Sequence, residues 1–262
     1  MLLKDKVTIV SGIGPGLGIK LAQEAARQGA KVVLLARTAQ KLDEAEALIK
    51  SEVPGCQILK TPADISNTAD VARVVQQTVE RFGRIDALIN SAYNGGNLSP
   101  FEDSNLKEWD NVFKVNLFGT LTLTQAVIPI MKKQGGGAVV MVNTMTVRKP
   151  MIGQIDYAAS KAALASATAH LALEYGAAGI RFNSAFMGWM WGPAVEGHVK
   201  HQAASAGVTE EVLKAEIAKM HALNLIPTDT ECAKPVIFLA SDYASMVTGA
   251  SLDVNGGAYI PH

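Results

Sequence analysis

The 262-residue sequence predicts an α/β fold, a doubly wound parallel sheet of about seven strands with helices on both faces. Three observations predict this fold. Short apolar runs alternate with longer, more polar segments that have helical periodicity. The apolar runs are continuous rather than alternating, as in strands that are buried on both faces. The turns between segments are short, as in repeated strand–helix units of a parallel sheet.

The expected strands are short and apolar, and they cover residues 7–10, 31–35, 57–62, 86–90, 138–142, 180–185 and 250–254. The expected helices lie between them, at 19–28, 40–50, 67–82, 106–133 (one or two helices) and 157–175. Most of these helices end at a glycine or a Pro-Gly pair, which stop helices. No linker or repeat interrupts the pattern, so we expect one domain over residues 1–262.

Residues 189–225 break the alternation, because they contain no expected strand and one expected helix, at 210–221. The insertion follows the carboxyl end of a strand, which is where ligands bind in sheets of this kind. We therefore expect a substrate lid in this segment.

The composition excludes several classes of protein. Hydrophobic residues make up 48% of the chain and charged residues 18%, which indicates a large core and not a disordered chain. Lys plus Arg equals Asp plus Glu at 24 each, so a nucleic-acid-binding surface is not expected. Cys56 and Cys232 do not suggest a disulfide framework or a metal site. No signal-peptide core or apolar span of twenty residues is present, which indicates a cytoplasmic protein without a membrane partner.

A glycine-rich turn follows the first expected strand, over residues 11–18. Gly12, Gly16 and Gly18 fit the spacing G-x-x-x-G-x-G, whereas G-x-G-x-x-G would need a glycine in place of Leu17. Glycines let the backbone approach a diphosphate, and the next helix offers free N–H groups and a positive dipole end. Between a strand and a helix, this turn predicts a Rossmann-like dinucleotide-binding fold; the alternative is a plain tight turn.

The end of the second expected strand indicates which dinucleotide is bound. NAD sites usually have a carboxylate there for the ribose 2′-hydroxyl. This chain has Ala36-Arg37-Thr38 instead. The guanidinium of Arg37 is suited to a 2′-phosphate. NADP(H) is therefore favoured over NAD(H), although a solvated surface arginine is the alternative.

Tyr157 and Lys161 are the strongest indication of chemistry. Residues four apart share a helix face, and a cation beside a phenol favours the phenolate. A phenol that exchanges a proton near neutral pH can serve a carbonyl–alcohol interconversion. Thr144, thirteen residues before Tyr157, offers a hydroxyl group at a strand end. Thr146 competes for this place if the loop is shifted by two residues.

Together these residues resemble the classical short-chain dehydrogenase/reductase family over essentially the whole chain. Further matching motifs are Asp64-Ile65, Asn90-Ser91-Ala92, Asn116, Thr248-Gly249 and Asn255-Gly256-Gly257. The resemblance implies that Tyr157 is the acid or base, that Lys161 also holds the nicotinamide ribose, and that Asn116 anchors a water relay. Thr144 would hold the substrate oxygen beside Tyr157. The cofactor would contact Ser11, Gly12, Gly14, Gly16, Leu17, Gly18, Arg37, Asp64, Ile65, Asn90, Tyr157, Lys161 and Gly188.

The sequence departs from the family pattern at four places. Thr144 stands where serine is usual, and its methyl group narrows the site. Tyr93 replaces a glycine, and Met187-Gly188 replaces Pro-Gly. Gly192-Pro193 stands where a threonine often touches the nicotinamide amide.

The side chains expected to line a substrate pocket are mostly aromatic or sulfur-containing: Tyr93, Met145, Met151, Phe186, Met187, Trp189, Met190 and Trp191. They predict an apolar or mixed alcohol or ketone as substrate, with ordinary core or subunit packing as the alternative. The family also implies a homotetramer or homodimer that pairs through helices around 105–133 and 157–175. A non-catalytic dinucleotide-sensing module, an NAD-dependent alcohol or diol dehydrogenase and an enoyl reductase are the other functional hypotheses. Enoyl reductases of this type commonly place six residues between Tyr and Lys, where this chain has three.

Overall fold

The structure, a computed structural model, describes residues 1–261 of the chain. The last residue of the expected domain, His262, lies outside the described residues. Seven strands form one parallel sheet in the order β3-β2-β1-β4-β5-β6-β7. The strands are β1 (Val7–Ser11), β2 (Lys31–Ala36), β3 (Ile58–Pro62), β4 (Ala87–Asn90), β5 (Gly137–Thr144), β6 (Ile180–Met187) and β7 (Ser251–Val254). The predicted fold class is confirmed.

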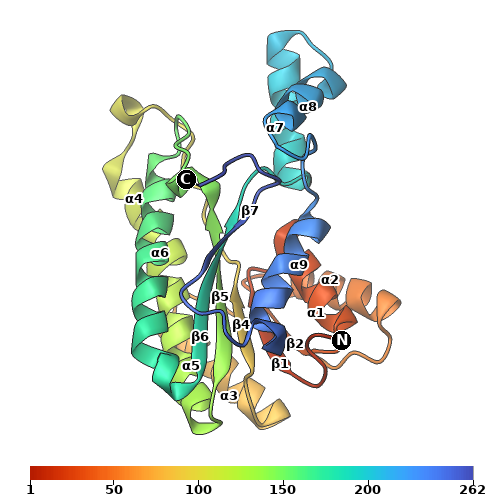
Figure 1. The fold of residues 1–262 in the computed structure, drawn as a ribbon, viewed down its shortest axis with the longest axis vertical. Coiled ribbons are helices and arrows are strands. Elements are labelled where there is room, and N and C mark those ends of the chain that lie inside the picture. The colour runs from red at the N-terminus through yellow and green to blue at the C-terminus, as the bar shows by residue number, and fades with distance from the viewer. Residues whose placement is uncertain (262) are drawn as a thin grey trace.

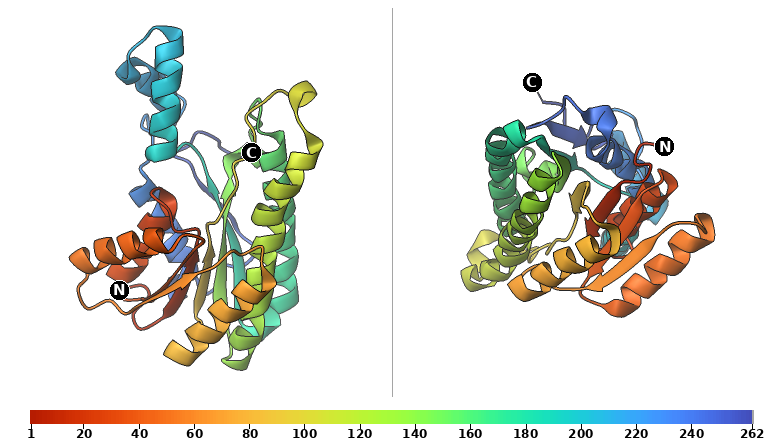
Figure 2. Two further views of the ribbon diagram at one scale, coloured as in Figure 1. Left: turned by 180° about the vertical axis from the view of Figure 1, so that it is seen from behind. Right: turned by 90° about the horizontal axis from the view of Figure 1, so that it is seen from below.

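The helices form two layers around the sheet, as Figure 1 and the view from below in Figure 2 show. One apolar core joins the sheet to α1 (Leu17–Arg27), α2 (Ala39–Glu52) and α9 (Asp229–Ala240). The other core joins its opposite face to α3 (Thr68–Phe82), α5 (Thr120–Lys133) and α6 (Ile155–Tyr175). The central strands β1 and β4 are buried along their whole length, which explains their continuous apolar sequences.

The order of the strands reverses between β1 and β4, because the chain winds outward from β1 to β3 and then crosses to β4. In such sheets, ligands bind outside the carboxyl ends of the strands at this switch point. The glycine-rich turn follows β1 there, and Thr144 ends β5 nearby in the sheet order. The fold therefore brings the two predicted halves of the site to one edge of the sheet.

The region of 106–133 is three helical pieces: α4 (Leu106–Phe113), a π-helix (Lys114–Gly119) and α5. π-Turns inside helices often occur at functional sites. Four 3₁₀ turns add to these helices, at Phe101–Asp103, Met145–Val147, Gly176–Ala178 and Asp242–Ala244.

The expected lid segment consists of α7 (Pro193–Ala206) and α8 (Glu210–Lys219), which project beyond the rest of the chain in Figure 1. They share a small apolar cluster of Val199, Ile217 and Ile226. The sequence predicted α8 but not α7. It also did not predict α9, which is buried against α1 and contains Pro235.

Candidate active site

Lys161 anchors the candidate site from helix α6. Tyr157 lies in the first turn of this helix, and Lys161 lies one turn later on the same side. The Lys161 side chain is only 2% exposed, and its Nζ donates a hydrogen bond to the Val142 carbonyl of β5 at 2.8 Å. The cation is therefore held just before the carboxyl end of β5, where Thr144 is the last strand residue.

Thr144, and not Thr146, is the hydroxyl residue that reaches Tyr157. Both threonines are buried, and a hydrogen bond with Thr144 lowers the pKa of the Tyr157 phenol. The Thr146 hydroxyl lies 3.2 Å from the Thr144 Oγ1, and the Thr146 amide donates to the same oxygen at 3.3 Å. These two contacts with Thr146 fix the orientation of the Thr144 hydroxyl.

The electrostatics of the site favour uncharged forms of both Tyr157 and Lys161. Burial raises the pKa of Tyr157 to about 12, with Thr144 opposing the shift and Tyr93 adding to it. Burial lowers the pKa of Lys161 to about 8. The Tyr93 ring, 60% exposed, packs edge-on against the Tyr157 ring with centroids 6.2 Å apart.

Asn116 clamps the loop after β4 onto α6. Its Oδ1 accepts from the Asn94 amide at 2.7 Å, and its Nδ2 donates to the Asn94 carbonyl at 2.9 Å. The same Nδ2 donates to the Ser160 Oγ at 3.0 Å, between Tyr157 and Lys161 in sequence. Both ends of this buried amide are engaged by protein atoms, so its side chain positions the loop that carries Tyr93.

Asp156 forms a second link to the same loop, and no sequence pattern indicates this link. Its carboxylate accepts from the Tyr157 amide at 2.7 Å and from the Asn97 amide at 3.3 Å. An acid in the first turn of a helix is common for electrostatic reasons alone, so its link to residue 97 is visible only in three dimensions.

The turn after β1 has the features of a diphosphate cradle. Gly12 has a φ of +80°, and a Cβ there would lie 2.4 Å from the Ala92 amide nitrogen, so a side chain has no room. A Cβ on Gly14 would meet nothing within 4 Å, so this part of the turn faces open space. Gly16, the N-cap of α1, makes no side-chain capping bond. The Ile19 amide donates to the Gly14 carbonyl at 3.3 Å, and the N–H groups of Leu17 and Gly18, which precede it in α1, are available to an anion.

The other predicted cofactor contacts divide into rim and interior positions. Arg37 is exposed at the end of β2. Burial raises the pKa of Asp64, but hydrogen bonds from Ser66 and the charges of Arg37 and Lys114 lower it overall. Asp64 is thus an ionised neighbour of Arg37. Three predicted contacts are interior or closely packed: Ser11 accepts from the Ser91 amide at 3.3 Å, Asn90 donates to Thr124 at 3.1 Å, and Ile65 is in the core.

Gly188 is also closely packed, because a Cβ there would lie 2.6 Å from the Asn255 Cβ. Leu17 is buried at the start of α1, and Gly18 follows it in the same turn. The structure therefore brings all the predicted cofactor residues to the carboxyl edge of the sheet, but the side chains of several of them serve packing.

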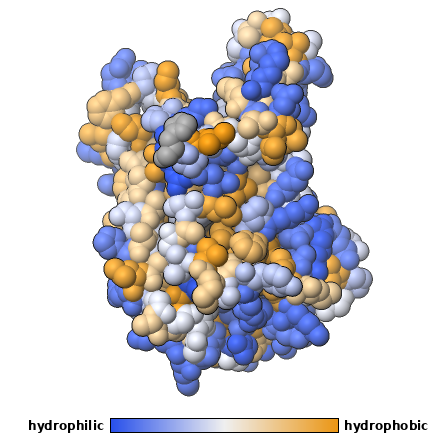
Figure 3. Space-filling model, in the orientation of Figure 1, coloured by the Kyte–Doolittle hydropathy of each residue, from blue (hydrophilic) through white to orange (hydrophobic). Residues whose placement is uncertain are grey.

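Three predicted substrate residues line one cavity of about 180 Å³: Met145, Met151 and Trp189. Lys149, Pro150, Met220 and Ala258 complete its wall, and the sequence did not indicate them. The Lys149 Nζ donates to the Ala258 carbonyl at 2.8 Å, which links the loop after β5 to the C-terminal segment. Figure 3 shows a notch in the surface between the α7–α8 projection and the α4 side of the molecule.

Tyr93 packs against Tyr157, and the other four predicted substrate residues lie elsewhere. β6 extends to Met187, two residues further than expected, so Phe186 and Met187 are buried sheet residues. The Arg148 guanidinium covers the Phe186 ring at 3.9 Å. Met190 packs against the core beside α9. Trp191 packs in the α7–α8 cluster, where the Lys214 ammonium lies 3.6 Å from its ring centre.

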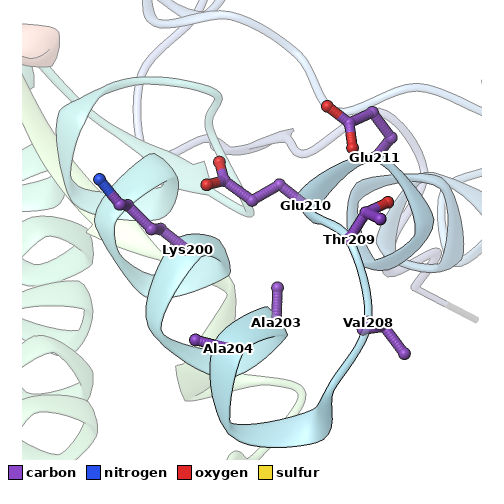
Figure 4. A pocket seen from close by; sticks show the side chains of 7 residues that line it. All are labelled: Lys200, Ala203, Ala204, Val208, Thr209, Glu210 and Glu211. Atoms are coloured by element: carbon purple, nitrogen blue, oxygen red, sulfur yellow. The ribbon is translucent and has the colours of Figure 1, made fainter.

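A larger cavity of about 380 Å³ lies between α7 and α8, away from every predicted site residue. Figure 4 shows Lys200 and Glu210 at its rim and two alanines on α7. Its walls are Lys200, Ala203, Ala204, Val208, Thr209, Glu210 and Glu211. Within residues 1–261, no group of three or more His, Cys, Asp or Glu side chains could hold a metal ion. No helix in the same range is long and apolar enough to cross a membrane.

Comparison with known proteins places this geometry in a family. The sequence matches the family described as enoyl-(acyl carrier protein) reductase over residues 12–259. Levodione reductase of Leifsonia aquatica is 34% identical over 255 residues, covering 97% of this chain and 94% of that protein. The crystal structure of L-sorbose reductase from Gluconobacter frateurii with NADPH and L-sorbose has a TM-score of 0.93 at 26% identity, covering 100% of each chain.

The crystal structure of NAD⁺-bound xylitol dehydrogenase has a TM-score of 0.89 at 27% identity, covering 98% of this chain and 100% of the other. The match to L-sorbose reductase covers the whole sheet, and the family match covers the glycine-rich turn from Gly12 and every later motif. The chain belongs to the short-chain dehydrogenase/reductase family and is an oxidoreductase that acts on CH–OH groups.

Proposed function

We propose that this protein is an NADP(H)-dependent oxidoreductase that interconverts an apolar or mixed alcohol and its ketone. One observation carries the proposal: the Thr144 side chain lies beside Tyr157 and lowers the pKa of its phenol, while Lys161 is fixed one helical turn away. A proton donor and a second hydroxyl lie side by side, and a cation lies one helical turn along α6 from the proton donor. This is the set that a carbonyl oxygen needs as it gains or loses a proton.

In the direction of reduction, Tyr157 donates its proton to the substrate oxygen, and Thr144 donates a hydrogen bond to the same oxygen. In oxidation, the phenolate of Tyr157 takes the proton back. The nicotinamide ring supplies or accepts the hydride when it is bound. Asn116 and Asp156 hold the Tyr93 loop against Tyr157, which limits the space around the reacting carbon.

The pKa of Tyr157 must fall for this chemistry to run near neutral pH. A value of about 12 lies about five units above neutrality, which corresponds to about 7 kcal/mol. Lys161, with a pKa of about 8, is still mostly a cation at pH 7. Its buried charge and the positive ring of the oxidised cofactor favour the phenolate. An exposed ion pair would contribute only about 0–1 kcal/mol, so the burial of Lys161 is essential to the proposal.

The preference for NADP(H) rests on Arg37. Its exposed guanidinium stands at the end of β2 without a carboxylate at positions 36–38. The relatives support either dinucleotide, since one structure holds NADPH and another NAD⁺. We expect Arg37→Ala to weaken NADPH binding by about tenfold or more while NADH affinity stays within about twofold. Equal affinity of the wild type for both dinucleotides, unchanged in the variant, would reverse the preference.

The substrate class rests on the cavity of Met145, Met151 and Trp189. Two thioethers and an indole form an apolar wall, and the nearby Lys149 ammonium is engaged by Ala258. Such a wall suits an apolar body with few polar groups. We infer that the α7–α8 segment acts as the lid of this site, because Trp189 and Met220 flank it and line the cavity.

The deciding experiment is a spectrophotometric screen of ketones and alcohols at the nicotinamide absorbance, followed by Tyr157→Phe. We expect the variant to lose at least about a thousandfold in turnover and to keep its NADPH affinity within about threefold. Tyr243→Phe, which changes an exposed tyrosine, is the matched control and should leave turnover unchanged. Full turnover in Tyr157→Phe would exclude the proposed mechanism.

An enoyl reductase is the second candidate, because the matching family carries that description. The three-residue gap between Tyr157 and Lys161 favours carbonyl chemistry, and the screen should therefore include an enoyl thioester. Activity on this thioester alone would favour the second candidate. Dinucleotide binding with no turnover on any compound would instead favour the non-catalytic sensing module.

We also propose that the protein forms a homotetramer or homodimer through the layer of α4, α5 and α6. This layer exposes Leu173 at 86%, Phe118 at 62% and Ile155 at 46%, which are apolar side chains that a second chain could cover. Light scattering after size exclusion should give a mass of two or four chains. Leu173→Glu should lower this mass.

Both cysteines are free thiols, as in a reducing cytoplasm.

A further inference from the structure

Asp229, the first residue of α9, has a buried carboxyl group that lacks a hydrogen bond. The residue is only 7% exposed, and no described residue donates a hydrogen bond to its carboxyl group. Its neighbour Glu231 is different, because it closes a capping box with Thr228 at 2.9 Å. An acid at a helix N-terminus normally contacts solvent or the helix N–H groups. Asp229 accepts no hydrogen bond from the N–H groups of its helix, and its carboxyl keeps only slight contact with solvent.

The carboxyl group points into the space between the glycine-rich turn and the base of α7. Its Oδ2 lies 3.5 Å from the point where a Cβ on Gly16 would be and 2.0 Å from the same point on Gly192. These residues are the N-caps of α1 and α7, and neither provides a capping side chain. In Figure 1, α9 runs beside α1 below the α7–α8 projection. Asp229 therefore borders the anion site at the start of α1.

The charges around Asp229 come from three helices. Burial raises the pKa of its carboxyl to about 6, with Lys20 of α1 opposing the shift and Glu196 of α7 adding to it. On α9 itself, burial together with the charges of Asp229 and Glu231 raises the pKa of the Cys232 thiol, which stays neutral. The partly buried Lys20 is thus the one cation near two acids, Asp229 and Glu196. A further anion placed here would meet an unpaired buried carboxylate at neutral pH.

We propose that Asp229 links dinucleotide binding to the uptake of one proton: the diphosphate binds at the start of α1 beside the protonated carboxyl, and ionisation of this carboxyl opposes binding. The protonated acid can donate a hydrogen bond to a phosphate oxygen, whereas the carboxylate can only repel it. This inference rests on the proposed function, because the diphosphate is the anion that binds. It adds that cofactor affinity depends on pH through a residue outside the glycine-rich motif.

The test measures the Kd of NADPH from pH 5 to 8.5 for the wild type and for Asp229→Asn. The 2′-phosphate also titrates near pH 6, but it is common to both proteins, so the ratio of the two Kd values isolates Asp229. We expect the Kd of the wild type divided by the Kd of Asp229→Asn to rise about tenfold per pH unit above pH 6 and to reach about 100 at pH 8. Calorimetry at pH 7.5 in two buffers of different ionisation enthalpy should show close to one more proton taken up by the wild type.

Glu196→Gln provides a second test that keeps Asp229 in place. Removing the neighbouring negative charge lowers the pKa of Asp229, so the loss of affinity should begin at lower pH than in the wild type. Glu210→Gln, an exposed substitution on α8, should leave the profile unchanged. A ratio of Kd values that stays constant with pH, or an unshifted profile in Glu196→Gln, overturns the inference and leaves the proposed function intact. Failure of NADPH and NADH to bind any of these proteins at any pH overturns both.

Discussion

The two sides of the candidate site bury ionisable groups in different ways. On the α6 side, hydrogen bonds hold each group: Lys161 donates to Val142, Thr144 reaches Tyr157, and Asn116 holds Ser160. On the α9 side, Asp229 has only the nearby charges of Lys20 and Glu196, with glycines around its carboxyl. On the α6 side, backbone and side-chain partners hold the functional groups through hydrogen bonds. On the α9 side, only nearby charges act on the carboxyl of Asp229.

The difference gives the two sides different tasks. The α6 side holds the reacting groups in place, and the α9 side changes its charge with pH. A side chain with fixed hydrogen-bond partners keeps its place whether or not a neighbour changes charge, as proton transfer requires. A carboxyl with a pKa of about 6 and no hydrogen bond changes its charge within the physiological range. We therefore expect substitutions on the α6 side to change turnover, and substitutions on the α9 side to change cofactor affinity and the pH dependence of stability.

After Tyr157→Phe, the largest effect on the α6 side should come from Lys161→Met. Methionine has a similar length but no charge, so the Tyr157 phenolate loses its cation, and turnover should fall about a thousandfold. Removing the buried ammonium should stabilise the fold by about 3 kcal/mol at pH 7, and loss of the donor to the Val142 carbonyl should cost about 1–3 kcal/mol, so the free energy of unfolding should stay equal or rise. Steady-state kinetics and urea unfolding measure the two effects. Lys133→Met, an exposed substitution on α5, is the control, and a loss below tenfold in Lys161→Met would remove Lys161 from the mechanism.

Thr144→Val should have a smaller effect and would decide between the two threonines. Valine keeps the shape but removes the hydroxyl, so turnover should fall about a hundredfold and the alkaline limb of the rate profile should move to higher pH, because Thr144 lowers the pKa of Tyr157. Thr144→Ser should keep most of the activity. Thr146→Val is the matched control, and we expect a loss of only a few-fold. If Thr146→Val were the more damaging change, the roles of the two threonines would be exchanged.

The sheet and most of the helices could be predicted from the sequence, because parallel strands buried on both faces have continuous apolar sequences. The seven expected strands correspond to β1–β7, with ends displaced by one or two residues. The two-residue extension of β6 had a consequence for the site. Two more residues of β6 are buried in the sheet, and so Phe186 and Met187 do not line the cavity.

Helix α9 was missed, although the pattern T-x-x-E at Thr228 and Glu231 marks its start. The helix is buried broadly, contains Pro235 and has little apolar periodicity, so the usual helical signal is weak. Its contribution to the site could not be predicted for this reason. The contacts of Asn116 and Asp156 with residues 94–97 could not be predicted either, because they join segments that only the tertiary structure brings together.

Asp229→Asn should have the smallest effect on turnover, which depends on the α6 side. Its effect on the free energy of unfolding should depend on pH. The folded-state pKa of about 6 lies above the usual value of 3.8, so the native state binds the proton more tightly between these values. Wild-type stability from this group is therefore complete below about pH 4 and is lost as pH rises through 6. The variant lacks this loss and should be more stable by about 3 kcal/mol at pH 8 and nearly equal at pH 4. Urea unfolding at both pH values measures the difference, and Asp110→Asn, an exposed substitution on α4, should show none. A variant that is less stable at pH 8 would mean that the Asp229 carboxylate has a stabilising partner, and the contrast between the two sides of the site would not hold.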